Sequence, residues 1–208
     1  MLDREKIVEA LAWVERETHL KTRQARMLSC GDQGELLQML SLMIKPKNIL
    51  ELGAFTGYST ICLSRGLQDD GMIDTIEVND ELQDIIETGF QMAGLLEKDS
   101  EKVRLHIGDA KSIVSSIDKE FDMVYIDANK REYCEYYNLV FDKVKIGGII
   151  LADNVLWSGK VLLENPPTDA QTQSIIRFNN MVKNDKRVEV VTLPLRDGLS
   201  LIYKISKS

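Results

Sequence analysis

Four residues in the second half of the chain could together carry out acid–base chemistry on an oxygen substrate. Asp127 ends one apolar run, and Asp153 and Asn154 end a later one. Ligands of parallel α/β sheets bind outside the carboxyl ends of the strands, where these oxygens could bind a hard divalent cation. Lys130 follows Asp127 closely enough to take a proton. Singly, such residues are typical of caps, turns and solvated loops, so the hypothesis rests on their combination.

A strand, a glycine-bearing turn and a helix start earlier in the chain indicate a nucleoside-type site. Gly53 would let the backbone approach a ligand closely, but Gly53-x-x-x-Gly57 is not the dinucleotide pattern Gly-x-Gly-x-x-Gly. Glu51 could accept hydrogen bonds from a cationic amino group. Glu77 ends the next strand and could bind both hydroxyls of a ribose. Asp109 could bind an adenine amine or, equally, cap a helix.

Alternating strands and helices from residue 47 onward would position these residues. We expect strands near 48–53, 72–77, 103–107, 121–127 and 148–153. We expect helices near 58–66, 80–93, 109–117 and 132–143. This alternation implies right-handed crossovers and a parallel sheet that carries helices on both faces.

The two ends of the chain differ from this alternating core. Within residues 1–45, apolar residues recur at helical spacing in two segments, first at Ile7, Leu11 and Val14 and then at Leu36, Leu37, Leu40, Met43 and Ile44. A helix near 168–184 precedes two strands, 188–193 and 199–203, and the Asp197-Gly198 turn joins them as a hairpin. We therefore expect an α/β fold with a seven-stranded, mostly parallel sheet that ends in a C-terminal antiparallel hairpin.

Composition places the chain among ordinary globular proteins. A length of 208 residues suits one domain, in which residues 1–45 would cover the site and residues 46–208 would form the core. The net charge, 26 − 33 = −7, disfavours nonspecific binding to nucleic acid or membranes. Three widely spaced cysteines suggest no disulfide framework and fit a reducing cytoplasm. No apolar run approaches the ~18 residues of a membrane span.

Five segments of the chain resemble the cation-dependent O-methyltransferases, the family typified by caffeoyl-CoA and catechol O-methyltransferases. The Gly-x-x-x-Gly pattern is shared by many methyltransferases, whereas Asp-Ala-x-Lys followed by Asp-Asn is far more specific. The resemblance extends from about Met27 to the end of the chain. The segments that carry it are 51–59, 108–110, 126–130, 153–159 and 193–198.

This resemblance implies a class I methyltransferase fold, which is Rossmann-like, S-adenosylmethionine as the methyl donor, and Mg²⁺ or a similar ion such as Mn²⁺ or Ca²⁺. Asp127, Asp153 and Asn154 would be the metal ligands, and Lys130 would be the base on the acceptor hydroxyl. Repulsion from a nearby dication favours loss of the lysine proton. The residues expected to line the cofactor are Ser29, Glu51, Gly53, Ala54, Ser59, Glu77, Asp109, Ala110 and Asn129.

The expected substrate contacts are Trp157 and Ser158. Trp157 could form an aromatic wall for a planar substrate or be plain core. Tyr133, Tyr136 and Tyr137 lie on a predicted helix, and we expect them to make packing or subunit contacts. Ser158 replaces an asparagine that touches substrate in the plant enzymes, and Asn129 stands where many members carry a second aspartate. The segment before Met27 is shorter than the arm that contributes to acyl-CoA binding in those enzymes, which disfavours a CoA thioester acceptor.

We therefore expect methyl transfer to a hydroxyl of a small catechol-like or phenolic acceptor, by a homodimer. The runner-up is O-methylation of a hydroxylated tRNA base, which the charge of −7 disfavours. A nicotinamide oxidoreductase would need a dinucleotide loop that this sequence does not have. A noncatalytic nucleoside-binding protein would be expected to have lost Lys130 or a metal ligand.

Overall fold

The computed structural model describes residues 3–98 and 100–207. Backbone contacts divide the chain into two compact units, Met1–Ile113 (unit 1) and Val114–Ser208 (unit 2). Within the described residues, no helix has both the length and the apolar character needed to cross a membrane. The expectation of one domain over residues 1–208 stays a prediction.

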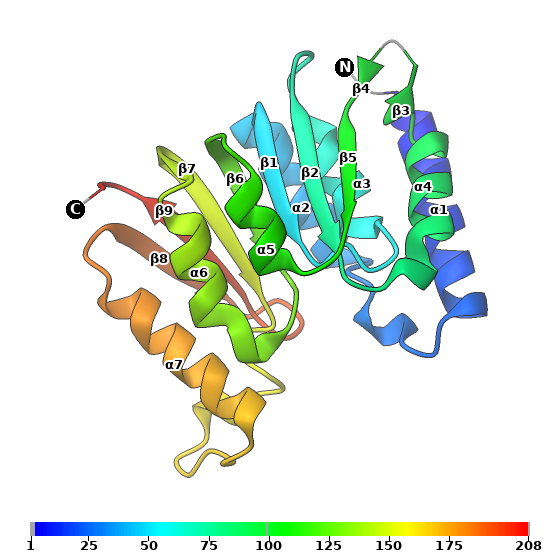
Figure 1. The fold of residues 1–208 in the computed structure, drawn as a ribbon. Coiled ribbons are helices and arrows are strands. Elements are labelled where there is room, and N and C mark those ends of the chain that lie inside the picture. Colours follow the sequence, from blue (N-terminus) through cyan, green and yellow to red (C-terminus); the bar gives the residue numbers. More distant parts are fainter. Residues whose placement is uncertain (1–2, 99, 208) are drawn as a thin grey trace. The chain divides into compact units, whose positions relative to one another are not determined.

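The predicted fold class is confirmed: the sheet is seven-stranded and mostly parallel, and it ends in a C-terminal antiparallel pair (Figure 1). The strand order is β5-β2-β1-β6-β7-β9-β8. These strands are β1 (Asn48–Leu52), β2 (Met72–Glu77), β5 (Val103–Ile107), β6 (Phe121–Ile126), β7 (Val144–Asp153), β8 (Val188–Leu193) and β9 (Leu199–Lys204).

Unit 1 contains three parallel strands whose carboxyl ends lie at one edge. Leu52 pairs with Ile76 and Ile76 pairs with His106, so β1, β2 and β5 end together. The α-helices that begin in this unit are α1 (Arg4–Lys21), α2 (Asp32–Ile44), α3 (Tyr58–Leu63), α4 (Gln83–Met92) and α5 (Ala110–Ser116). Helices α1 and α4 lie side by side (Figure 1).

Helix α2 buries a face that its apolar pattern does not predict. Leu37 and Ser41 are fully buried, whereas Met43 is 72% exposed. The Ser41 hydroxyl donates to the carbonyl of Leu63 and accepts from the backbone N–H of Gly66. Because these bonds satisfy the hydroxyl, a polar residue can lie inside the packing while an apolar one faces solvent.

Most differences between the predicted and the observed elements involve short strands and 3₁₀ turns. A hairpin of β3 (Leu96–Glu97) and β4 (Ser100–Glu101) was not predicted, because two-residue strands carry no periodic pattern. Several predicted helices begin or end in a tighter 3₁₀ turn. The 3₁₀ turns are η1 (Ala25–Met27), η2 (Ser64–Gly66), η3 (Asp80–Leu82), η4 (Lys130–Glu132) and η5 (Lys160–Leu162).

Unit 2 combines one parallel strand pair with two antiparallel pairs. Strand β7 begins at Val144 and not near 148, because the β6–β7 register shifts around Gly147, whose φ of 83° accommodates the irregularity. Helices α6 (Tyr133–Phe141) and α7 (Ala170–Asn184) lie side by side (Figure 1). Phe178 of α7 packs edge-on to the Tyr133 ring at a centroid distance of 5.3 Å.

Candidate active site

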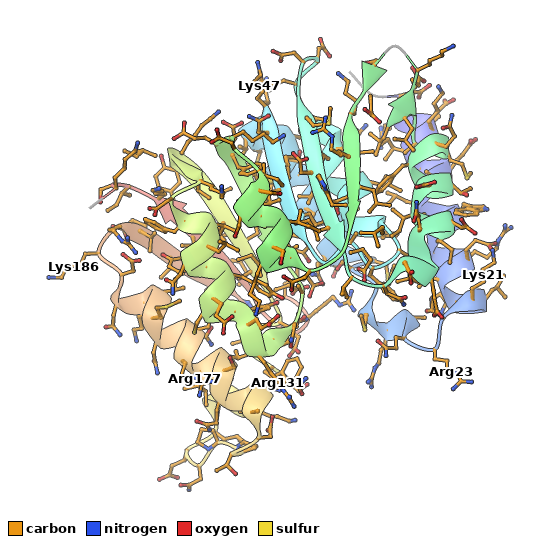
Figure 2. The ribbon with its side chains drawn as sticks, in the orientation of Figure 1. Lys21, Arg23, Lys47, Arg131, Arg177 and Lys186 are labelled. Carbon is orange, nitrogen blue, oxygen red and sulfur yellow. The ribbon has the colours of Figure 1, made fainter. Side chains whose placement is uncertain are left out.

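Asp127 and Lys130 form a close ion pair immediately after β6. The Lys130 Nζ lies 2.5 Å from Asp127 Oδ1 and 2.8 Å from the hydroxyl of Tyr133. The two charged side chains are only 12% (Lys130) and 18% (Asp127) exposed. Lys130 is therefore not a solvated loop charge. By contrast, the neighbouring Arg131 is exposed and its side chain points outward (Figure 2).

The register of β6 and β7 brings the predicted metal ligands to one edge of unit 2. Ile126 pairs with Ala152 in the parallel ladder. Asp127 and Asp153 follow these residues on neighbouring strands, and Asn154 comes next. The prediction that these side chains are delivered to one rim is thus met by the strand pairing, while their role as metal ligands stays a prediction.

Asp153 is held in place by two hydrogen bonds. Its Oδ2 accepts from the Tyr125 hydroxyl at 3.1 Å, and its Oδ1 accepts from the backbone N–H of Asn154 at 2.7 Å. The side chain is almost fully buried. Asn154 itself has a φ of 57°, a left-handed conformation that asparagine tolerates better than most residues.

Tyr133 connects the parts of this cluster, although it was not among the predicted site residues. Its buried hydroxyl donates toward the carbonyls of Ile126, at 3.2 Å, and Asp153, at 2.9 Å, and accepts from Lys130. Burial raises the pKa of this phenol well above its ordinary value, and the charges of Asp127 and Asp153 raise it further. The i,i+3 spacing from Lys130 was the signal that could have identified it.

The donor atoms of this cluster fit a hard divalent cation. Asp127 and Asp153 supply carboxylate oxygens and Asn154 supplies an amide oxygen, the ligand types that Mg²⁺, Mn²⁺ and Ca²⁺ prefer. Across residues 3–98 and 100–207, no three His, Cys, Asp or Glu side chains gather as a metal site. A cation held here would therefore depend on Asn154 as its third protein ligand.

The loop that carries the predicted substrate residues has an unusual backbone. Trp157 and Ser158 have φ values of 47° and 54°. Asp197, in the β8–β9 turn, fixes them: its carbonyl accepts from Leu156 N at 2.8 Å and its carboxylate accepts from Ser158 N. The indole Nε1 of Trp157 is buried and has no hydrogen-bond partner among the described residues, so a bound molecule could satisfy it.

In unit 1, the turn after β1 is shaped by backbone hydrogen bonds. The amides of Gly53 and Ala54 donate to one carbonyl of β2 at 2.9 and 3.0 Å, and Gly53 has a φ of 96° that favours glycine. Phe55 also has a positive φ, and its N–H donates to Glu77 Oε2 at 2.7 Å. Glu77 Oε1 accepts from the amide two residues later at 2.8 Å. Glu77 thus already holds two backbone amides in place.

Glu51 lies beneath this turn and not on its surface. The side chain is fully buried, and its carboxylate accepts hydrogen bonds from the hydroxyls of Ser59, Thr60 and Thr75. Burial raises the pKa of this carboxyl, and the three hydroxyls oppose that shift. Contact of this carboxylate with a cationic amino group stays a prediction.

The remaining predicted cofactor residues have local structural roles. Asp109 caps α5: its Oδ2 accepts from the backbone N–H and the hydroxyl of Ser112, both at 2.9 Å. The cap alternative is therefore confirmed, while the adenine contact stays a prediction. Asn129 Oδ1 accepts from the amide two residues later at 3.2 Å. Ser29 and Ala110 are nearly buried, and their cofactor contacts also stay predictions.

Two surface pockets have linings that include none of the predicted site residues. One of about 390 Å³ in unit 1 is lined by residues such as Lys6 and Gly94. Another of about 560 Å³ in unit 2 is lined by residues of α7 and β8. Because no predicted site residue lines either pocket, the chemistry of the side chains identifies the candidate site better than these pockets do.

Comparisons with known proteins identify the family to which this chain belongs. A family profile described as O-methyltransferase matches residues 4–205. Caffeoyl-CoA O-methyltransferase 1 of Nicotiana tabacum is 33% identical over 194 residues, which cover 86% of this chain and 78% of that protein. The same enzyme type in Mesembryanthemum crystallinum is 35% identical over 194 residues, covering 86% of this chain and 74% of that protein.

A solved structure extends the likeness to the fold. The O-methyltransferase TomG from Streptomyces achromogenes, involved in tomaymycin synthesis and solved in complex with SAM, is 29% identical with a TM-score of 0.84. The match covers 98% of this chain and 91% of TomG. The predictions of family and enzyme class are confirmed: the chain belongs to the O-methyltransferase family.

Proposed function

We propose that this chain transfers a methyl group from S-adenosylmethionine to a hydroxyl of a phenolic acceptor, in a reaction that needs a divalent cation. The observation that carries the proposal is the cluster at the ends of β6 and β7. There a largely shielded lysine lies 2.5 Å from one carboxylate, and the next strand delivers a second carboxylate beside it.

Asp127, Asp153 and Asn154 would hold the cation. When bound, such an ion supplies positive charge that stabilises the oxyanion of the acceptor. Tyr125 and the backbone N–H of Asn154 orient the Asp153 carboxylate, which preorganises the site before any ligand arrives.

Lys130, as the neutral amine, acts as the general base on the acceptor hydroxyl. The acceptor oxygen attacks the methyl carbon, its proton passes to Lys130 Nζ, and the new O–C bond forms as the S–C bond breaks. The electron pair of the broken bond stays on sulfur, so the sulfonium donor leaves as a neutral thioether. Alignment of oxygen, carbon and sulfur provides most of the remaining rate enhancement.

The donor side of the proposal rests on unit 1. Gly53, Ala54 and Ser59 would line the donor, and Glu77 would bind its ribose through lone pairs that its two amide bonds leave open. Solved relatives support the donor: TomG was solved with SAM and a Podospora anserina methyltransferase with SAH. Ser29, Glu51, Asp109 and Ala110 complete the proposed set in unit 1, and Asn129 of unit 2 stays a proposed donor contact.

A planar phenolic ring is the acceptor we favour, with Trp157 as its aromatic wall and Ser158 beside it. The names of the plant relatives point to a phenolic CoA thioester, whereas the sequence expectation favours a small free acceptor. Both carry the hydroxylated ring that the proposed chemistry needs, so the ring is the part of the acceptor that the proposal specifies.

A transfer assay on the purified protein tests this proposal. The methyl group of S-adenosylmethionine is labelled, Mg²⁺ is supplied, and the acceptors are catechols, hydroxycinnamates, caffeoyl-CoA and bulk tRNA. We expect label on at least one phenolic compound and none on tRNA. Label on tRNA alone would replace the proposed acceptor with a hydroxylated base, and label on no phenol would contradict the proposal.

We further propose a cytoplasmic homodimer with a single domain over residues 1–208. Multi-angle light scattering measures the oligomeric state directly, with one mass of twice 23.6 kDa expected. A monomer mass would contradict the dimer and leave the proposed chemistry untouched.

A further inference from the structure

The hydroxyl of Tyr133 has three polar neighbours inside unit 2. Tyr133 is the first residue of α6 and is fully buried. Its oxygen lies 2.9 Å from the carbonyl of Asp153, 3.2 Å from the carbonyl of Ile126 and 2.8 Å from Lys130 Nζ. These neighbours are the ends of β6 and β7 and the proposed base, so one atom joins all three.

The number of hydrogens on each group fixes the direction of each hydrogen bond. A phenol has one hydrogen, and a carbonyl only accepts. The Tyr133 hydrogen therefore points to the carbonyls of Ile126 and Asp153, and a lone pair of its oxygen faces Lys130. After Lys130 has taken the acceptor's proton, its ammonium group has three N–H bonds. One donates to Tyr133 and one to Asp127, and the third is the bond that the transferred proton forms.

We propose that the Tyr133 hydroxyl is a positioning group for methyl transfer, which holds Lys130 Nζ at the edge where Asp127 and Asp153 lie. The inference rests on the proposed role of Lys130 as the base. Asp127 alone would not hold Lys130 Nζ in place, because a bound cation would compete with Lys130 for the Asp127 carboxylate. Tyr133 is not one, so its hydroxyl serves Lys130 whether or not a cation is bound.

Packing alone does not require this hydroxyl. The Tyr133 ring lies edge-on to Phe178 at 5.3 Å and tilted to Tyr136 at 6.5 Å, contacts that a phenylalanine ring would also make. The hydroxyl adds only the three polar contacts. Tyr133→Phe therefore removes the proposed function and keeps the shape of the side chain.

A double-mutant cycle tests the proposal on the purified enzyme with its best acceptor, Mg²⁺ and donor. The proteins are wild type, Lys130→Ala, Tyr133→Phe and the double variant. We expect Tyr133→Phe to lower kcat by about 10- to 100-fold, since misplacing a reacting group by ~1 Å can cost ~10² in rate. We expect KM for the donor to change little. In the Lys130→Ala background, Tyr133→Phe should have no further effect on kcat.

The outcomes separate this inference from the proposed function. If Lys130→Ala leaves kcat unchanged, the proposed base is wrong. If Lys130→Ala lowers kcat but Tyr133→Phe does not, or lowers it by the same factor in both backgrounds, the positioning role is overturned. The matched control is Tyr136→Phe. Tyr136 lies on the same helix as Tyr133, and its buried phenol donates to Glu132 at 2.6 Å. This variant should leave kcat within about twofold, as expected of a group that does not touch the base.

A measurement on the wild-type protein covers the case in which Tyr133→Phe does not fold. Nuclear Overhauser effects between the Lys130 ε-methylene and the ring hydrogens of Tyr133 report their contact in solution. The structure predicts a strong effect, because Lys130 Nζ lies 2.8 Å from the hydroxyl. Its absence would overturn the proposal.

Discussion

Glu51 and Glu77 of unit 1 are held by a different kind of partner from Asp127 of unit 2. In unit 1, Glu51 accepts from three hydroxyls and Glu77 accepts from two backbone amides. In unit 2, Asp127 pairs with a lysine. Asp153 of unit 2 has partners of the same kind as Glu51 and Glu77, because it accepts from a backbone amide and from a tyrosine hydroxyl.

This difference separates residues that shape the backbone from residues that are poised to exchange partners. Hydroxyls and amides bound to a buried carboxylate fix the turn beneath a ligand, and removing them leaves buried groups unsatisfied. By contrast, a cation or an acceptor can displace the Lys130 ammonium from the Asp127 carboxylate, because the cation can neutralise the carboxylate and the acceptor oxygen can accept from the ammonium. We therefore expect mutations in unit 2 to affect rate most, and those in unit 1 to affect binding and stability.

Lys130→Ala should have the largest effect of the variants that keep all three proposed cation ligands. If Lys130 is the base, kcat should fall by about 10²- to 10⁴-fold, the usual share of general base catalysis. Binding of the donor, measured by calorimetry, should be retained, because Lys130 is a proposed ligand of neither donor nor metal. The residual rate should rise with pH as hydroxide replaces the base.

Two matched variants sharpen this result. Lys130→Arg should not restore the rate, since a guanidinium keeps its proton at working pH. Arg131→Ala removes a positive charge from the next residue, whose side chain points outward (Figure 2), and should leave kcat nearly unchanged. A fully active Lys130→Arg variant would mean that the position supplies only charge.

Glu77→Ala should weaken binding and not catalysis as such. Loss of its carboxylate frees the amide of Phe55 and would leave the ribose hydroxyls unpaired. We expect binding of S-adenosylhomocysteine to weaken by roughly 1–3 kcal/mol, measured by calorimetry. Glu81→Ala, at an exposed position of η3, is the control. Unchanged affinity of Glu77→Ala would remove Glu77 from the donor site.

Glu51→Gln should have the smallest effect, a change in how stability depends on pH. Burial raises the folded-state pKa of Glu51 above the ordinary carboxyl value of 4.5. The contribution of this group to stability is therefore full below that ordinary value and is lost as pH rises through the folded-state pKa. The free energy of unfolding, from urea titrations at several pH values, should decline over this window more in wild type than in Glu51→Gln. Equal slopes would contradict a raised pKa.

Strand ends and motif spacing made much of this molecule predictable. The run of residues before Asp127 and the run before Asp153 predicted two neighbouring parallel strands, and the ladder has Ile126 opposite Ala152. Periodicity predicted helix α2 but not its buried face, because Ser41 is buried by hydrogen bonds that an apolar pattern does not register.

The partners of the charged groups could not be predicted from the sequence. Glu51 was expected at the ligand surface, yet its three hydroxyl partners come from α3 and β2 and enclose it. Tyr133 was expected to pack, and its contacts with Lys130 and two strand ends arise only once α6 is docked on the sheet of unit 2. Such contacts depend on tertiary packing, which local spacing does not encode.

Cation dependence tests the central claim most directly. Methyl transfer by the wild-type enzyme should stop in excess chelator and return when Mg²⁺ or Mn²⁺ is added back, because Asp127, Asp153 and Asn154 are proposed to act through a bound cation. Asp153→Ala should be inactive under both conditions, while its unit 1 still binds S-adenosylhomocysteine. Undiminished activity of wild type or of Asp153→Ala in chelator would contradict a cation site at these strand ends.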